Sequence, residues 1–291
     1  MPIKVTVGLC VKNCTRMIQT AFDSIASQDY PHELIKLVIV DDGSTDNTLQ
    51  CAKKFAQEID MYSFVTSNPS RGIASARQVV VDNAEGTYIV WTDDDLMLCS
   101  DYVRRHVEFM ERNPEVGGAR GICDVYRAQS FFGLDDLVFL THSANPCQIG
   151  TGGSVFRIEA LRKAGGFDIQ INGAGEDIDV SRRVRHFGWV LATNELAGFH
   201  HTHSPSTPMA FWSRNFRYGY ANHFLFHRYG DRRLIIQYFL PFALLYGLKM
   251  SHELYKLTRV KKVFLYFIVN SLTMNVQNLG YTRSHLDKYG H

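Results

Sequence analysis

Short apolar runs rich in β-branched residues alternate with segments of helical periodicity over about the first 95 residues. The apolar runs are Val5–Val11, Leu37–Val40, Phe64–Thr66 and Tyr88–Trp91. Between them, apolar side chains recur at helical spacing, most clearly over residues 17–25 and 74–84. Strands buried in parallel sheets are near-continuous apolar runs, and strands that alternate with helices favour parallel pairing with helical crossovers. The pattern therefore predicts an α/β fold with a mostly parallel central sheet and flanking helices.

The last third of the chain has a different pattern. Residues 234–248 are apolar except for Gln237, but 15 residues fall short of the roughly 20 that span a bilayer. Further on, apolar residues recur at helical spacing, namely Leu265, Ile268, Val269, Leu272 and Val276. We therefore expect one α/β domain over residues 1–220 and a helical, basic and apolar C-terminal extension over residues 221–291.

Charge is distributed unevenly, although the whole chain has a net charge of only +2. Residues 1–180 hold 16 Lys/Arg and 25 Asp/Glu, whereas residues 181–291 hold 15 Lys/Arg and 4 Asp/Glu. The acidic part can supply carboxylates to a metal ion, and the basic part suits phosphate groups or an anionic membrane surface. Arginines and aromatic residues are interleaved in the basic part, but no nucleic-acid-binding module accompanies them, so we expect no nucleic-acid partner.

The cysteines and the N-terminus indicate the compartment. Six cysteines are scattered without a Cys-x-x-Cys pair or a zinc-site spacing, which predicts reduced core residues. The apolar run near the N-terminus is too short and too soon interrupted for a signal peptide. Both features predict a cytoplasmic protein.

Acidic residues follow two of the predicted strands. Asp93, Asp94 and Asp95 come directly after one strand, and Asp42 follows another. Ligands of open parallel sheets bind beyond the carboxyl ends of the strands. Three adjacent carboxylates suit a hard divalent ion, Mg²⁺ or Mn²⁺, and alternation along an extended chain directs Asp93 and Asp95 to one side and Asp94 to the other. Each cluster taken alone is also compatible with a solvated turn or a helix cap.

Three further segments carry candidate chemistry. Arg71 and Arg77 flank a small-residue stretch and match a pyrophosphate, although a surface arginine on a helix has the same appearance. Gly152 and Gly153 suit a backbone that lies close to a ligand, or a tight turn. The pair Glu176–Asp177 precedes a helical pattern and offers a general base, or merely favourable charge at a helix N-terminus.

Taken together, these segments resemble the inverting family 2 glycosyltransferases of the GT-A fold. The resemblance runs from Val5 to about Gly219 and rests on five elements in order. They are the Val5–Asn13 strand, VDDGSTDNT at 40–48, RGIASAR at 71–77, TDDD at 92–95, and GGSVFR, GGFD and GEDIDVSRR between Gly152 and Arg183. Each motif is weak alone, but their order and spacing together are specific.

The resemblance implies a single sugar transfer from a nucleotide-sugar donor, with a UDP sugar favoured, to a glycan or lipid-linked acceptor. Asp177 would be the catalytic base. Donor-binding residues would be Cys10, Val11, Asp42, Arg71, Arg77, Asp93 and Asp94. Acceptor-binding residues would be Gly152, Gly153 and Glu176. Asp93, Asp95 and either His201 or His203 would hold Mn²⁺ or Mg²⁺.

The chain departs from the family pattern in two places. Cys10 stands where a proline commonly precedes Asn13, and the QxxRW-type motif of processive synthases is missing, which favours a single transfer. A nucleotidyltransferase and a non-catalytic nucleotide-sugar-binding protein remain as alternatives. The basic, aromatic tail favours peripheral association with the cytoplasmic membrane face, or else an ordinary packed or dimer-forming subdomain.

Overall fold

A computed structural model describes residues 4–69, 71–123, 147–171, 173–202, 207–230, 238–259 and 261–289. The described chain forms two compact units. Of the described residues, the first unit contains those up to 123, 147–171 and 176–202, and the second contains 173–175 and those from 207 onward. The boundary expected after residue 220 falls inside a helix, α8 (Pro208–Tyr229).

The first unit is built on an eight-stranded mixed sheet with the order β3-β2-β1-β4-β7-β6-β8-β5. Strands β1 to β4 pair in parallel, whereas β7 pairs antiparallel with both β4 and β6. The strands are β1 (Val5–Val11), β2 (Ile35–Asp41), β3 (Tyr62–Ser67), β4 (Tyr88–Asp93), β5 (Leu96–Leu98), β6 (Val116–Cys123), β7 (Ser154–Arg157) and β8 (Val190–His201). The four apolar runs predicted as strands are thus confirmed as the parallel half of the sheet.

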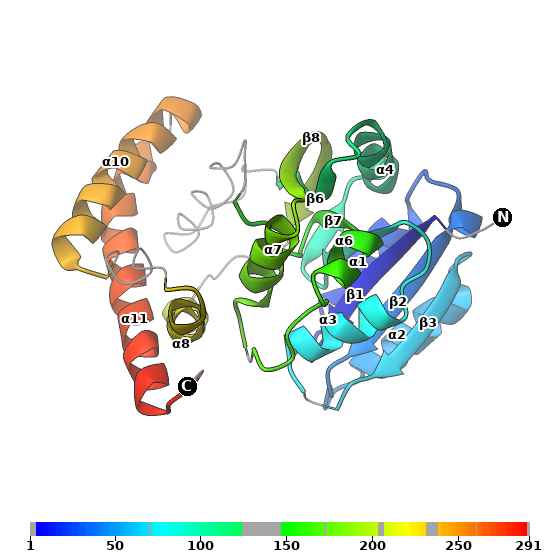
Figure 1. Ribbon diagram of the computed structural model, residues 1–291, viewed down its shortest axis with the longest axis horizontal. Coiled ribbons are helices and arrows are strands. Elements are labelled where there is room, and N and C mark those ends of the chain that lie inside the picture. Colours follow the sequence, from blue (N-terminus) through cyan, green and yellow to red (C-terminus); the bar gives the residue numbers. More distant parts are fainter. Residues whose placement is uncertain are drawn as a thin grey trace. The chain divides into compact units, whose positions relative to one another are not determined.

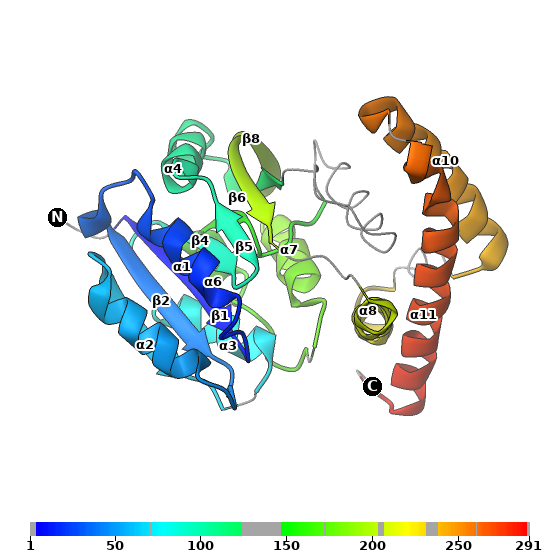
Figure 2. The same cartoon turned by 180° about the vertical axis from the view of Figure 1, so that it is seen from behind.

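Helices cover both faces of this sheet (Figures 1 and 2). They are α1 (Ile18–Ala26), α2 (Thr48–Glu58), α3 (Ile73–Asp82), α4 (Tyr102–Arg112), α6 (Ile158–Lys163) and α7 (Glu176–His186). On one face, α3, α6 and α7 share a core cluster that includes Val80, Trp91 and Phe156. On the other face, α1 and α2 meet through Phe22 and Phe55, whose rings stack with centroids 4.1 Å apart. The unit is therefore a three-layer α/β fold, as predicted.

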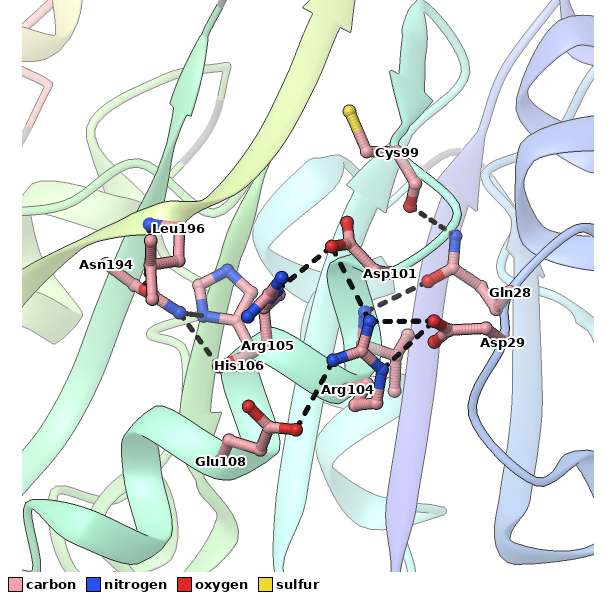
Figure 3. Close-up of polar contacts among 11 residues, drawn as sticks. Gln28, Asp29, Cys99, Asp101, Arg104, Arg105, His106, Glu108, Asn194 and Leu196 are labelled. Atoms are coloured by element: carbon pink, nitrogen blue, oxygen red, sulfur yellow. Dashed lines mark hydrogen bonds and ion pairs between the residues drawn. The ribbon is translucent and has the colours of Figure 1, made fainter.

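A polar network anchors α4 beside the strand that follows the acidic cluster (Figure 3). Gln28 donates to the Cys99 carbonyl and accepts from the Val103 backbone N–H, each at 2.9 Å. Arg104 bridges Asp29, at 2.8 Å, and Glu108, at 3.3 Å. The network ties the end of α1 to the β5–α4 connection, which fixes the chain on the C-terminal side of the acidic residues.

The second unit is helical, with α8 (Pro208–Tyr229), α10 (Leu240–Thr258), the short η3 (Lys261–Leu265) and α11 (Tyr266–Leu286). The predicted helical tail is therefore confirmed, although residues 234–237 of its apolar stretch lie outside the described residues. Helix α11 packs closely on α8 at Gly219, where the lack of a side chain permits the contact. A Cβ at this position would lie 1.8 Å from the Gln277 carbonyl oxygen. Within the described ranges, no helix has the length and apolar content needed to cross a bilayer.

The cysteines agree only in part with the expectation of a core location. All six are free thiols, and Cys10, Cys14 and Cys123 are buried. Cys51 and Cys99 are half-buried. Cys147 is exposed, because it lies in a bend outside the regular elements.

Candidate active site

The carboxyl ends of β1, β2 and β4 lie side by side. Cys10 of β1 pairs with Val40 of β2 on one side and with Asp93 of β4 on the other. The Asp42 backbone N–H donates to the Val11 carbonyl at 2.9 Å, which holds Asp42 just beyond the same edge. The structure therefore brings Cys10, Val11, Asp42 and Asp93 together, as the motifs implied.

Asp93 ends β4 in a space that a glycine leaves open. A Cβ at Gly152 would lie 2.2 Å from Asp93 Oδ2, so a larger residue at position 152 would displace the carboxylate from this position. Burial raises the pKa of Asp93, Arg77 opposes this shift, and the neighbouring Asp95 adds to it. The Arg77 guanidinium lies 3.4 Å from Asp93 Oδ1.

Asp95 faces a histidine of the neighbouring strand. His201 Nδ1 lies 3.8 Å from Asp95 Oδ2, and the antiparallel pairing of β5 with β8 sets this register. His200 instead directs its Nε2 toward Cys99 Sγ, 4.0 Å away, because adjacent strand residues point to opposite faces. The register thus places His201 beside the acidic cluster, whereas His203 lies outside the described residues.

Asp94 lies with Asp95 in the turn between β4 and β5. Its carboxyl group makes a hydrogen bond with the Cys14 side chain. Burial raises the pKa of Asp94 to about 6. The expected alternation assumed an extended chain, whereas Asp94 and Asp95 lie in a turn after β4; the hydrogen bond to Cys14 is what distinguishes Asp94 from Asp93 and Asp95.

A buried ion pair joins α3 to the start of α7. Arg77 contacts both Glu176 and Asp93, and the side chains of Arg77 and Glu176 are only 9% and 5% exposed. Burial raises the pKa of Glu176 to about 7, against the opposing effect of Arg77. In the part of the chain that the structure describes, Glu176 Oε2 is buried without a hydrogen-bond partner. Arg77 therefore binds protein carboxylates here, in a position where a donor diphosphate was expected.

Asp177 lies in the first turn of α7 and is half-buried. Its Oδ1 accepts a hydrogen bond from the Ile178 backbone N–H at 2.7 Å. Burial raises the pKa of Asp177, and Arg77 opposes the shift. A Cβ at Gly150 would lie 3.6 Å from Asp177 Oδ2, so the other carboxylate oxygen borders the glycine-rich loop.

Asp42 is a hub for three segments. Its Oδ1 accepts from Asn68 Nδ2 at 3.0 Å and from the Gly72 backbone N–H at 3.1 Å. Lys12 Nζ donates to its Oδ2 at 3.2 Å. Lys12 and Asn68 were not among the residues expected in the site, although each directly follows a parallel strand, which is a signal that the sequence carries. Arg71 is exposed beside this hub.

Gly153, which was expected to border the acceptor, packs against an aromatic ring. It adopts a φ of 73°, and a Cβ there would lie 2.5 Å from the Phe199 ring. Its N–H donates to the Trp91 carbonyl at 3.2 Å. Glycine is therefore needed at this position for backbone conformation and for contact with the ring.

The donor atoms beside β4 fit a hard divalent cation. Two carboxylates and one imidazole are a ligand set that Mn²⁺ accepts, and the absence of a side chain at Gly152 keeps Asp93 Oδ2 unobstructed. The donor atoms of Asp93, Asp95 and His201 do not all lie within 4.8 Å of one another. Binding would thus draw the three side chains together.

Two family profiles match the chain. The glycosyl transferase family 2 profile matches residues 6–135, and the glycosyl transferase family group 2 profile matches residues 88–276. The chain therefore belongs to the family 2 glycosyltransferases, as its motifs indicated. It is 33% identical to glycosyltransferase GlyA of Streptococcus pneumoniae over 100 residues. This alignment covers 34% of this chain and 14% of GlyA. It is also 30% identical to the putative glycosyltransferase EpsE of Bacillus subtilis over 111 residues. This alignment covers 38% of this chain and 39% of EpsE.

Solved structures share the fold over nearly the whole chain. The mannosyltransferase PcManGT from Pyrobaculum calidifontis, in complex with GDP-Man and Mn²⁺, aligns with a TM-score of 0.71 and 17% identity, over 99% of this chain and 90% of that one. S. aureus TarS 1–349 in complex with UDP aligns with a TM-score of 0.56 and 16% identity, over 99% and 92%. The fold is therefore GT-A.

Proposed function

We propose that the chain transfers a single sugar from a nucleoside-diphosphate sugar, a UDP sugar, to an acceptor hydroxyl with inversion at the anomeric carbon. The observation that carries this proposal is the convergence of carboxylates around Arg77, whose charge interacts with Glu176, Asp93 and Asp177. These residues come from three separate elements and meet at the carboxyl edge of a parallel sheet. The PcManGT and TarS structures, which carry GDP-Man and UDP, support a nucleotide-sugar donor.

The donor binds at the carboxyl ends of β1 and β2. The backbone of Cys10 and Val11 lines the nucleotide pocket, and Asp42 accepts hydrogen bonds from the base or the ribose. Lys12 and Asn68 hold the Asp42 carboxylate in place. Arg71 is exposed and offers its guanidinium to the base or to the phosphates.

Asp93, Asp95 and His201 are the residues that would hold Mn²⁺ or Mg²⁺. A bound ion supplies Lewis-acid stabilisation to the diphosphate that leaves. Asp94 forms a hydrogen bond with Cys14. This contact holds the β4–β5 turn so that Asp93 and Asp95 face the ion. Gly152 leaves room for the Asp93 carboxylate and, with Gly153 and Glu176, borders the acceptor.

Asp177 acts as the base. The acceptor oxygen forms a bond to the anomeric carbon while the bond from that carbon to the diphosphate oxygen breaks. Asp177 takes the hydroxyl proton, and the nucleoside diphosphate leaves with the electron pair. Burial raises the pKa of Asp177, which makes it a stronger base than an ordinary aspartate. The Arg77–Glu176 ion pair fixes the first turn of α7 and so positions Asp177.

The test is a screen for nucleoside-diphosphate release from UDP, GDP and dTDP sugars, with Mn²⁺ or with EDTA and a mixture of glycan and lipid-linked acceptors. We expect Asp177→Asn to lower turnover by about 10² to 10⁴ because it removes the base. Donor binding by that variant should stay near wild type, whereas Asp95→Asn should lose metal-dependent binding. Asp60→Asn, an exposed carboxylate just after α2, is the matched control.

The outcomes separate the alternatives. Metal-dependent release that falls in Asp177→Asn but not in Asp60→Asn supports the proposal, and the anomeric coupling constant of the product reports inversion. Metal-dependent donor binding with no release from any acceptor mixture would favour a nucleotide-sugar-binding protein. Failure to bind any nucleotide sugar would refute the donor assignment.

We further propose that residues 221–291 associate peripherally with an anionic membrane surface, where the acceptor is lipid-linked. The start of α10 exposes a series of apolar side chains, which defines the α10 apolar surface. It consists of Phe239, Leu240, Phe242, Leu244, Leu245, Tyr246 and Leu248. Exposed lysines and arginine follow at Lys249, Lys256, Arg259, Lys261 and Lys262. Apolar residues next to basic ones are typical of helices that lie in a membrane interface.

Vesicle sedimentation tests the membrane proposal. The wild-type chain should pellet with vesicles that contain phosphatidylserine and much less with pure phosphatidylcholine. Leu245→Glu should weaken pelleting, because it places a charge on the α10 apolar surface. Leu196→Glu is the matched control in the other unit, since Leu196 and Leu245 are both 65% exposed. Equal pelleting of the two variants and wild type would contradict the proposal.

A further inference from the structure

Three histidines from two helices converge in the C-terminal unit. His223 and His227 lie one turn apart near the end of α8, and His285 lies in the last turn of α11. The three residues offer donor atoms that all lie within 4.8 Å of one another. His223 is fully buried, whereas His227 and His285 are exposed, so the cluster opens to solvent on one side.

The spacing of these atoms is that of a coordination site. His223 Nε2 lies 3.2 Å from His285 Nδ1. In a tetrahedral zinc site with Zn–N bonds of about 2.0–2.1 Å, neighbouring ligand atoms lie roughly 3.3–3.4 Å apart. The His223 ring centroid is 4.4 Å from that of His227 and 5.3 Å from that of His285. An ion between the three rings would therefore need only small side-chain adjustments.

Two contacts on the side of His223 away from His285 orient its ring. Its Nδ1 lies 3.1 Å from the Tyr289 carbonyl oxygen and 3.2 Å from Ser284 Oγ. A carbonyl oxygen only accepts hydrogen bonds, so Nδ1 donates to it, and Nε2 is the ring nitrogen that faces His285. Metal-binding histidines characteristically donate their other ring nitrogen to a carbonyl or carboxylate in this manner.

We propose that His223, His227 and His285 bind Zn²⁺, or a chemically similar transition-metal ion, which links the end of α8 to the end of α11. Three imidazoles favour Zn²⁺, Co²⁺, Ni²⁺ and Cu²⁺ over Mg²⁺ and Mn²⁺, which prefer oxygen ligands. The site is therefore distinct in chemistry from the carboxylate cluster of the catalytic unit. It also uses none of the residues on which the proposed transfer depends.

Titration of the metal-free full chain with Co²⁺ tests this inference, because tetrahedral Co²⁺ has visible absorption bands. The Asp93→Asn/Asp95→Asn double variant serves as the background, so that the carboxylate cluster does not contribute. We expect one equivalent of Co²⁺ with a tetrahedral spectrum, displaced by one equivalent of Zn²⁺. His227→Gln and His285→Gln should each weaken Co²⁺ binding by at least about tenfold. Loss of a residue that only hydrogen-bonds to a metal ligand already costs about this much, and loss of the ligand itself should cost no less.

His252→Gln is the matched control, since His252 is an exposed histidine on α10 of the same unit. Its Co²⁺ affinity should equal that of the background. Zn²⁺ should also raise the melting temperature of the background and of His252→Gln, but not that of His285→Gln. Because His227 and His285 are exposed, circular dichroism should report intact folding in both variants. Absence of a tetrahedral spectrum, or equal Co²⁺ affinity in all variants, would overturn the inference and leave the histidines as tilted and edge-on ring contacts between α8 and α11.

Discussion

The Arg77–Glu176 ion pair offers a sharp test of how the catalytic unit is held together. Both side chains are nearly buried, and the same guanidinium lies 3.4 Å from Asp93. Arg77→Met keeps most of the side-chain volume but leaves two carboxylates without their cation. Removal of one partner of a buried ion pair typically costs about 3–5 kcal/mol, whereas replacement of both partners by neutral groups is often close to neutral. We therefore expect Arg77→Met to lose about 3–5 kcal/mol of unfolding free energy.

The double variant Arg77→Met/Glu176→Gln should recover most of this loss, because only the half-buried Asp93 then lacks its partner. The pH dependence follows from the same reasoning. Without Arg77, the raised pKa of Glu176 rises further, so the folded state holds a proton that the unfolded state releases above about pH 4.5. Wild-type Glu176 releases its proton near pH 7, so the loss in Arg77→Met should grow by about 1.4 kcal/mol per pH unit only above about pH 7. The double variant should lack the part of this slope that Glu176 contributes.

Urea unfolding in EDTA, followed by tryptophan fluorescence, measures these differences, since Trp91 lies in the core cluster of this unit. Amide hydrogen exchange of β4 and α7 confirms that the catalytic unit is the one that unfolds. The reasoning is refuted if Arg77→Met costs less than about 1 kcal/mol, the size of a surface ion pair, or if the second substitution recovers nothing.

Two other predictions concern stability away from this pair. Burial lowers the pKa of His106 to about 3, so the folded state keeps it neutral while the unfolded state takes up a proton below about pH 6.5. Wild type should therefore lose about 1.4 kcal/mol per pH unit more than His106→Gln between pH 6 and pH 4, and parallel urea-midpoint curves would contradict this. Gly219→Ala should lower the melting temperature of the C-terminal unit although alanine favours helices by about 1 kcal/mol, because its Cβ would lie 1.8 Å from the Gln277 carbonyl oxygen. A higher melting temperature would show that α8 and α11 separate without cost.

Sequence pattern was sufficient for the parallel half of the sheet. The apolar runs beginning at Val5, Leu37, Phe64 and Tyr88 lie within β1 to β4. The runs in β1, β2 and β4 are apolar because these strands are buried on both faces, whereas β3 is a partly exposed edge strand. Sequence was insufficient for the second half, in which β6, β7 and β8 pair across long separations. Their partners depend on a mixed topology that local periodicity does not encode.

The acidic residues show the same division. Asp42, Asp93 and Asp95 were predictable as neighbours, since the carboxyl ends of parallel strands share one edge. In contrast, the choice of His201 over His200 required the register of β5 against β8, which sequence does not supply.

The amino-acid sequence by itself determined the fold class, the family and the acidic edge, because each rests on local periodicity or on motifs that are contiguous in the chain. Only the tertiary structure decided which side chains meet. Arg77 and Glu176 are 99 positions apart, and His223 and His285 are 62 apart. Contacts over such separations arise from the packing of α3 against α7 or of α8 against α11, and packing depends on the shape of both partners at once.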